Sequence, residues 1–270
     1  MRILFFGDIV GKPGREAIKK ILPKLKEKYE PDLVFANGEN LAHGKGITEE
    51  SVKEVLSAGI DYLTLGNHTF AIKGASDILE NKKMSVIRPA NWAPNTPGRG
   101  CAQISLRSKK ILLVNLIGRV YMGQQFDNPF SAIDEILEEY SLGKESGKEH
   151  VSAIIVDWHA EATSEKMIMG WYLDGKVSAV LGTHTHIGTD DWRVLPGGTA
   201  YVTDIGMVGP QNSVLGVDKD IILKRFLTQI NYRMEVAQGP VLAEVMLLTL
   251  DDKTGLAQDI QKIKEIVEVG

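Results

Sequence analysis

Short apolar runs alternate with amphipathic helical stretches along most of this chain, and this alternation constrains the fold more than any other feature. The first run, residues 3–6, reads Ile-Leu-Phe-Phe and precedes a stretch, residues 13–29, whose apolar positions recur at helical spacing. Further apolar runs follow at residues 33–36 and 62–65. Strands that alternate with helices are typical of layered α/β proteins. We therefore predict one α/β domain that spans residues 1–270.

Other segments carry weaker signals. Residues 69–79 and 257–267 predict helices, and the short run at 85–87 predicts a strand. The polar segment 141–149 predicts a loop.

The composition excludes several classes of protein. The 270 residues include 31 Lys and Arg and 35 Asp and Glu, which gives a net charge of −4. Stable binding of duplex nucleic acid needs a basic face, so we expect no such partner. Cys101 is the only cysteine, which excludes an intramolecular disulfide and a cysteine-based zinc site. The apolar runs are too short for a signal peptide or a membrane span, so we expect a cytoplasmic protein without a membrane partner.

Side chains that bear oxygen or nitrogen follow five of the apolar runs, where each predicted strand ends. They are Asp8, Glu39, Asn40, Asn67, His68, His159, His184 and His186. Ligands bind beyond the carboxyl ends of strands in open α/β sheets, so we expect these groups to meet in one crevice. Asp8 or Asn67 alone would more often stabilise a turn. The joint pattern, with the alternating pair His184 and His186 on one face, predicts a metal site.

The chemistry of these donors narrows the choice of metal. Carboxylate, amide and imidazole ligands without thiolate suit Fe or Mn, with Zn as the alternative. Seven of the side chains, all except His68, are candidate ligands, and seven exceed what one tetrahedral ion needs. Two ions that share a bridging carboxylate use such a set, and two metals ~3.5–4 Å apart assist in-line displacement at phosphorus. We therefore predict two metal ions.

The candidate ligands lie in short blocks that follow one another along the chain. The blocks are Gly7-Asp8, Gly38-Glu39-Asn40, Gly66-Asn67-His68, Asp157-Trp158-His159 and Gly182-Thr183-His184-Thr185-His186. These blocks resemble those of the calcineurin-like metallophosphoesterases, and more closely those of the YmdB-like subfamily. The resemblance implies a sandwich of two mixed β-sheets flanked by helices. It also implies a homo-oligomer that hydrolyses small phosphodiesters, with 2′,3′-cyclic nucleotides as the expected substrates.

The same resemblance implies a role for each residue. Glu39 is the expected bridging ligand. His68 is expected to assist the leaving group after a metal-bridging hydroxide attacks phosphorus. The other expected ligands are Asp8, Asn40 and His186 for one metal and Asn67, His159 and His184 for the other.

Three positions depart from the pattern of the broader family. Val10 stands where that family has a histidine, and the bridging position is Glu39 rather than an aspartate. Thr69 stands where a carboxylate usually follows the Gly-Asn-His block, so we expect His68 to lack a local orienting partner.

The sequence leaves two other functions open. A non-catalytic regulator that senses a metal or a nucleotide would carry the same ligands, and turnover against a metal-stripped control separates it from an enzyme. An RNA-processing nuclease would need a basic and aromatic groove, for which Trp92 and Tyr121 are too scattered. Four further residues are candidates for substrate contact, although structural roles are the expectation: Lys12, His43, Asn91 and Arg119.

Overall fold

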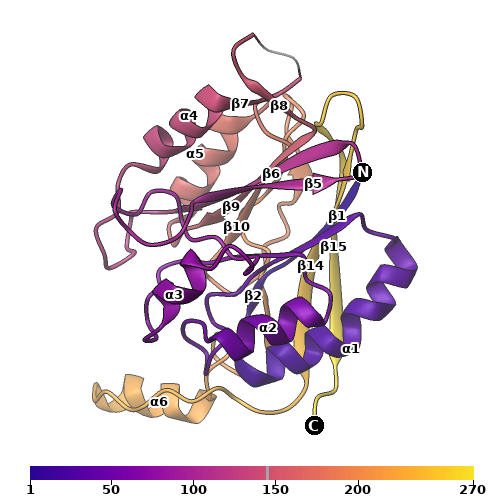
Figure 1. Ribbon diagram of the computed structural model, residues 1–270. Helices are drawn as coiled ribbons and strands as arrows, with labels where there is room; N and C mark the ends of the chain where they lie inside the picture. Colours follow the sequence, from indigo (N-terminus) through magenta and orange to yellow (C-terminus); the bar gives the residue numbers. More distant parts are fainter. Residues whose placement is uncertain (144–145) are drawn as a thin grey trace.

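The computed structural model describes residues 1–143 and 146–270. Within these residues the strands form two mixed sheets, stacked face to face, and a separate two-stranded ribbon (Figure 1). Helices cover the outer faces of both sheets, so the predicted α/β sandwich is confirmed. No helix of the described residues is both long and apolar enough to cross a membrane.

The first sheet is built from both ends of the chain. Its strands are β1 (Arg2–Phe6), β2 (Asp8–Ile9), β3 (Leu33–Asn37), β4 (Tyr62–Thr64), β13 (Met207–Pro210), β14 (Val241–Leu250) and β15 (Ala257–Val267). Strands β1, β3 and β4 are parallel. Strand β14 runs antiparallel to them, between β1 and β15, and also pairs with β13.

The second sheet comes from the middle of the chain. Its strands, in spatial order, are β11 (Arg193–Val194), β12 (Ala200–Val202), β10 (Ala179–Thr183), β9 (Ala153–His159), β6 (Lys109–Ile117) and β5 (Cys101–Leu106). The four central strands, β12, β10, β9 and β6, are parallel, so their carboxyl ends meet at one edge. The ribbon pairs β7 (Tyr140–Leu142) with β8 (Glu149–Val151).

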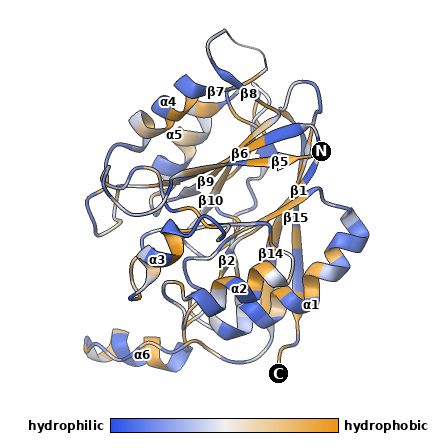
Figure 2. Cartoon of the chain, viewed as in Figure 1, coloured by the Kyte–Doolittle hydropathy of each residue, from blue (hydrophilic) through white to orange (hydrophobic). Residues whose placement is uncertain are grey.

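Successive side chains of a strand point to opposite faces of its sheet. The apolar side chains therefore form three layers, one between the two sheets and one on the outer face of each sheet. In β1, Ile3 and Phe5 pack between the two sheets, whereas Leu4 and Phe6 pack against the outer helices. Those helices are α1 (Gly11–Tyr29), α2 (Glu49–Ser57) and α3 (Ala75–Glu80). Helices α4 (Pro129–Glu139) and α5 (Thr163–Leu173) cover the second sheet. Figure 2 shows the apolar residues concentrated along the strands.

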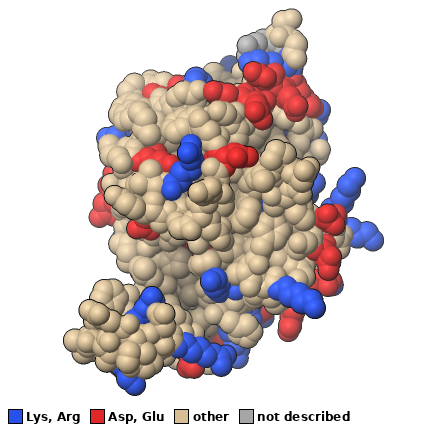
Figure 3. Space-filling model, turned by 90° about the vertical axis from the view of Figure 1, so that its left-hand side faces the viewer, with Lys and Arg blue, Asp and Glu red and all other residues tan. Residues whose placement is uncertain are grey.

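Helix α6 (Lys219–Thr228) differs from the other helices. It protrudes from the body of the molecule (Figure 1), and each of its residues is partly or fully exposed. On the face viewed in Figure 3, charges of both signs lie among uncharged residues, and the largest group of acidic residues lies at its upper end.

The helix predicted at residues 257–267 is wrong, because this segment is strand β15. Ile260 and Ile263 are three residues apart, a spacing that indicates a helix. In a strand, residues three apart point to opposite faces. Ile260 packs between the sheets and Ile263 packs against the outer layer, so pairing with β14 gives both side chains a buried position without a helix.

Three weaker expectations also need correction. The predicted helix at 69–79 is shortened to α3, since Gly74 adopts the left-handed conformation at φ 93° directly before it. The predicted strand at 85–87 is a single bridge between Val86 and Leu63. The predicted loop at 141–149 overlaps β7 and β8 at its two ends, and residues 144–145 of it lie outside the described residues.

Candidate metal centre

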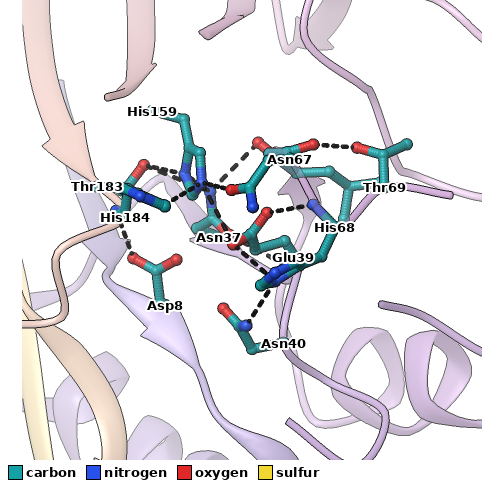
Figure 4. A network of polar contacts seen from close by, with 12 residues as sticks. Asp8, Asn37, Glu39, Asn40, Asn67, His68, Thr69, His159, Thr183 and His184 are labelled. Carbon is teal, nitrogen blue, oxygen red and sulfur yellow. Dashed lines mark hydrogen bonds and ion pairs between the residues drawn. The ribbon is translucent and has the colours of Figure 1, made fainter. Parts of the chain in front are cut away.

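The polar residues predicted at strand ends meet where the two sheets face each other. Asp8 begins β2, which only Gly7 separates from β1, and His159 is the last residue of β9 rather than the residue beyond it. His184 follows β10 at once. Figure 4 shows Asp8, Glu39, Asn40, Asn67, His159 and His184 turned toward one another. The first sheet supplies the carboxylates, the amides and His68, and the second sheet supplies the other three imidazoles.

Four side chains converge at one point of this crevice. One ligand atom from each of Glu39, His159 and His184 lies within 4.8 Å of the others. His159 Nε2 is 3.2 Å from Glu39 Oε1, 3.1 Å from His184 Nδ1 and 3.1 Å from Asn67 Oδ1. Carboxylate, amide and imidazole atoms at such spacing could hold one metal ion.

Three further side chains lie beside the first group. His186 Nε2 is 3.7 Å from Asp8 Oδ1. Asp8 Oδ1 and Asn40 Oδ1 are buried, and neither has a hydrogen-bond partner within the described residues. A buried oxygen without a partner costs ~1–3 kcal/mol, and more when it is charged. A cation at this position would satisfy both oxygens, so the residues present fit a second metal.

Burial and neighbouring charges together set the protonation of Glu39, His184 and His186. Burial raises the pKa of the Glu39 carboxyl, but His159 and His68 outweigh burial and hold that pKa well below its usual value. Burial lowers the pKa of His186, but Asp8 raises it to about 9. Burial and the neighbouring His159 lower the pKa of His184 to about 3. His184 is therefore neutral and keeps a lone pair for a ligand.

His68 lies at the open side of the cluster, with 28% of its side chain exposed. Its Nδ1 is 3.2 Å from Glu39 Oε1 and 3.2 Å from Asn40 Nδ2, and its backbone N–H donates to Glu39 Oε2 at 2.9 Å. Thr69 donates its hydroxyl to the carbonyl of Gly66 at 2.6 Å. The orienting contacts of His68 therefore come from Glu39 and Asn40, which are distant in sequence.

A buried polar chain behind His159 was not anticipated from the sequence. His159 Nδ1 lies 2.9 Å from Thr183 Oγ1, and that hydroxyl donates to Asp157 Oδ1 at 2.6 Å. Asn37 Nδ2 donates to Asp157 Oδ2 at 2.9 Å. Burial raises the pKa of Asp157 to about 6. These contacts turn His159 Nε2 toward the crevice, as outer hydrogen bonds do for metal-binding histidines. The available signal was a charged residue within an apolar strand, two positions before His159.

A buried ion pair holds the loop that carries His184 and His186. Lys166 and Asp204 form this pair, and each side chain is 1% exposed. Lys166 Nζ also donates to the carbonyl of Thr183 at 2.7 Å, and Asp204 Oδ2 accepts from the backbone N–H and hydroxyl of Thr185. His184 and His186 have positive φ angles of 97° and 63°, which are unfavourable for histidine. The ion pair therefore stabilises a strained loop.

The remaining candidates take structural or peripheral positions. Lys12 is exposed and pairs with Glu16 at 3.4 Å. Asn91 donates to the carbonyls of Ile117 and Asp127, which fixes its loop. His43 is exposed, and Arg119 is held through its backbone N–H by the carboxylate of Glu165 at 2.9 Å.

The fold and the cluster together define a metallophosphoesterase. The fold is similar to that of the calcineurin-like phosphoesterase YfkN from Bacillus subtilis, with a TM-score of 0.58 at 11% identity, over 99% of this chain and 90% of that one. The chain belongs to the YmdB-like protein family, whose model matches residues 4–263. The family resemblance predicted from the motifs is therefore confirmed.

Two relatives are similar over nearly their full length. The 2′,3′-cyclic-nucleotide 2′-phosphodiesterase of Bacillus subtilis (strain 168) is 44% identical over 263 residues, which cover 97% of this chain and 96% of the relative. The crystal structure of a hypothetical protein from Thermus thermophilus has a TM-score of 0.90 at 40% identity, over 99% of this chain and 100% of that one. This chain is thus an enzyme, a phosphoric diester hydrolase of the metallophosphoesterase class.

Proposed function

We propose that this enzyme hydrolyses 2′,3′-cyclic nucleotides with two metal ions held between its sheets. The observation that carries the proposal is the convergence of Glu39, Asn67 and His184 on His159 Nε2, beside the unpartnered oxygens of Asp8 and Asn40. The substrate named for the Bacillus subtilis relative supports the choice of diester.

Each ligand has a proposed place in this site. Glu39 contacts both His159 and His68 and would bridge the metals. When bound, such metals neutralise charge on phosphoryl oxygens and lower the pKa of a coordinated water. The donor chemistry suits Fe or Mn, with Zn as the alternative. The proposed ligands of the two ions are Asp8, Asn40 and His186 for one and Asn67, His159 and His184 for the other.

Residues of the chain also prepare the site for an anionic diester. Asn67 is a neutral ligand, so the site keeps more positive charge than it would with a carboxylate there. His68 is partly exposed beside Asn67, where its ring can hold a proton for the departing oxygen. Thr183 and Asp157 keep His159 in one orientation.

We also propose that the enzyme is a cytoplasmic homo-oligomer. Light scattering of the purified protein measures its mass and therefore its number of subunits.

The first test is turnover of 2′,3′-cyclic AMP by the purified protein loaded with Mn²⁺. We expect release of a nucleoside monophosphate, and we expect a chelator-stripped sample to lose this activity. Metal analysis of the same samples provides a readout that is independent of activity. Absence of turnover with two metals bound per chain would contradict the proposal and favour a sensing role for the same site.

The role of His68 is tested by His68→Ala. We expect kcat to fall by roughly 10²-fold or more with the metal content retained, because proton transfer to a leaving group contributes ~10²–10⁴-fold. His150→Ala is the matched control, since His150 is exposed in β8 and lies outside the cluster. Unreduced turnover in His68→Ala would remove the acid role.

A further inference from the structure

A cavity of about 310 Å³ opens beside the metal centre. Asn67 and His68 line one side of it, so the cavity is continuous with the proposed reacting groups. Phe70, Trp92 and Met122 line it as well, from segments that are distant in sequence. This cavity is therefore lined both by the proposed reacting groups and by a wall of apolar and aromatic side chains.

The aromatic wall is held by edge-to-face packing. The ring centroids of Phe70 and Trp92 are 5.1 Å apart with an interplanar angle of 81°, and those of Trp92 and Phe126 are 5.1 Å apart at 73°. Ile117, Met122 and Phe126 form a small apolar cluster against which Trp92 packs. Fixed aromatic rings bind planar bases with little loss of side-chain freedom, and such stacking tolerates any base.

Polar groups at the cavity complement the edge of a base. Trp92 Nε1 is buried and finds no hydrogen-bond acceptor within the described residues. A buried indole N–H usually has a partner. The amide of Gln124, exposed at the rim, offers both a donor and an acceptor. The amide of Gln124 can pair with the edge of a base in the cavity, and the indole N–H, which has no exposed surface, reaches an acceptor on that edge when the Trp92 ring shifts.

We infer that this cavity is a nucleobase subsite, which binds the base of a nucleotide whose phosphodiester lies at the metal centre. The inference rests on the proposed function and adds to it that the enzyme selects nucleosides over base-free phosphodiesters. A volume of about 310 Å³ is at the lower end of small-ligand pockets, ~300–1,000 Å³. That size suits one base with part of its ribose.

The test compares kcat/KM for 2′,3′-cyclic AMP with kcat/KM for the base-free analogue methyl riboside 2′,3′-cyclic phosphate. We expect the wild-type enzyme to prefer the nucleotide by about tenfold or more, because stacking on an aromatic side chain favours a base by that order. Phe70→Ala should lower this ratio by about tenfold. Trp92→Phe keeps an aromatic ring but removes the N–H and part of the indole surface, and should lower the ratio by ~2- to 10-fold, on the order of the loss of one hydrogen bond.

Phe226→Ala is the matched control, because Phe226 is 79% exposed on α6 and lies outside the cavity. We expect it to leave the ratio unchanged. If the wild-type enzyme hydrolyses both substrates equally, or if both variants keep the wild-type ratio, the nucleobase subsite is wrong and the phosphodiesterase proposal stands. If neither substrate is hydrolysed with two metals bound, both proposals are wrong. A ratio that falls in both variants but not in the control supports the subsite.

Discussion

Replacing Glu39 by Gln is expected to remove bound metal and hydrolytic activity together. Glu39 Oε1 is 3.2 Å from both His159 Nε2 and His68 Nδ1, so its charge is shared by the groups on each side of it. The amide has nearly the same shape and lacks the charge that a bridging ligand supplies. We expect activity to fall by at least roughly 10³-fold, since metals contribute several kcal/mol to such a transition state.

Two measurements on Glu39→Gln show whether lost activity comes from loss of the metals or from loss of the fold. Elemental analysis reports the metals per chain, and circular dichroism reports whether the fold is intact. Glu50→Gln is the control, because Glu50 is an exposed carboxylate in the first turn of α2. Two metals per chain in Glu39→Gln would refute the bridging assignment, whatever the effect on activity.

Lys166→Met is expected to give the largest loss of stability among single changes near the site. It leaves Asp204 buried and charged without its cation, and removal of one partner of a buried pair costs ~3–5 kcal/mol. Chemical denaturation measures this loss. Lys53→Met is the control, because the exposed pair of Lys53 with Glu49 is worth less than ~1 kcal/mol. A cost for Lys166→Met no larger than for Lys53→Met would contradict the prediction.

The loss of folding stability caused by Lys166→Met should also depend on pH. Burial raises the pKa of Asp204 even with Lys166 present, and loss of the lysine removes an interaction that lowers it. A carboxyl with a raised folded-state pKa takes up its proton more readily when folded, so the variant gains stability relative to the wild-type protein as pH falls. The double variant Lys166→Met/Asp204→Leu leaves no unpaired charge, and we expect it to recover most of the lost stability.

The sequence predicted the candidate ligands better than the residues that support them. Asp8, Asn67 and His184 each follow an apolar run, and the rule that ligands bind beyond strand ends needs only that local signal. Asp157 lies inside β9, and Thr183 is the last residue of β10. Their partners come from distant segments, so only the assembled sheets show that these two side chains orient His159.

The wrong secondary-structure predictions also arise because the deciding information is not in the local spacing of apolar residues. At residues 257–267 the local spacing of Ile260 and Ile263 favours a helix, and only pairing with β14, a long-range contact, decides for a strand. At residues 69–79 a single left-handed glycine, Gly74, delays the start of the helix to Ala75. Long-range pairing and isolated backbone geometry are both weakly encoded in spacing.

The place of β14 has a consequence for how this protein matures. Strand β14, residues 241–250, lies beside β1, and Arg2–Phe6 pairs with its residues 245–249. Every proposed ligand is translated before β14, so a nascent chain carries the complete ligand set while β1 still presents an unpaired edge. Closing a pairing across some 240 residues is slow compared with local folding. Completion of the first sheet, and of the metal centre beside it, therefore waits until residues 241–250 pair with β1.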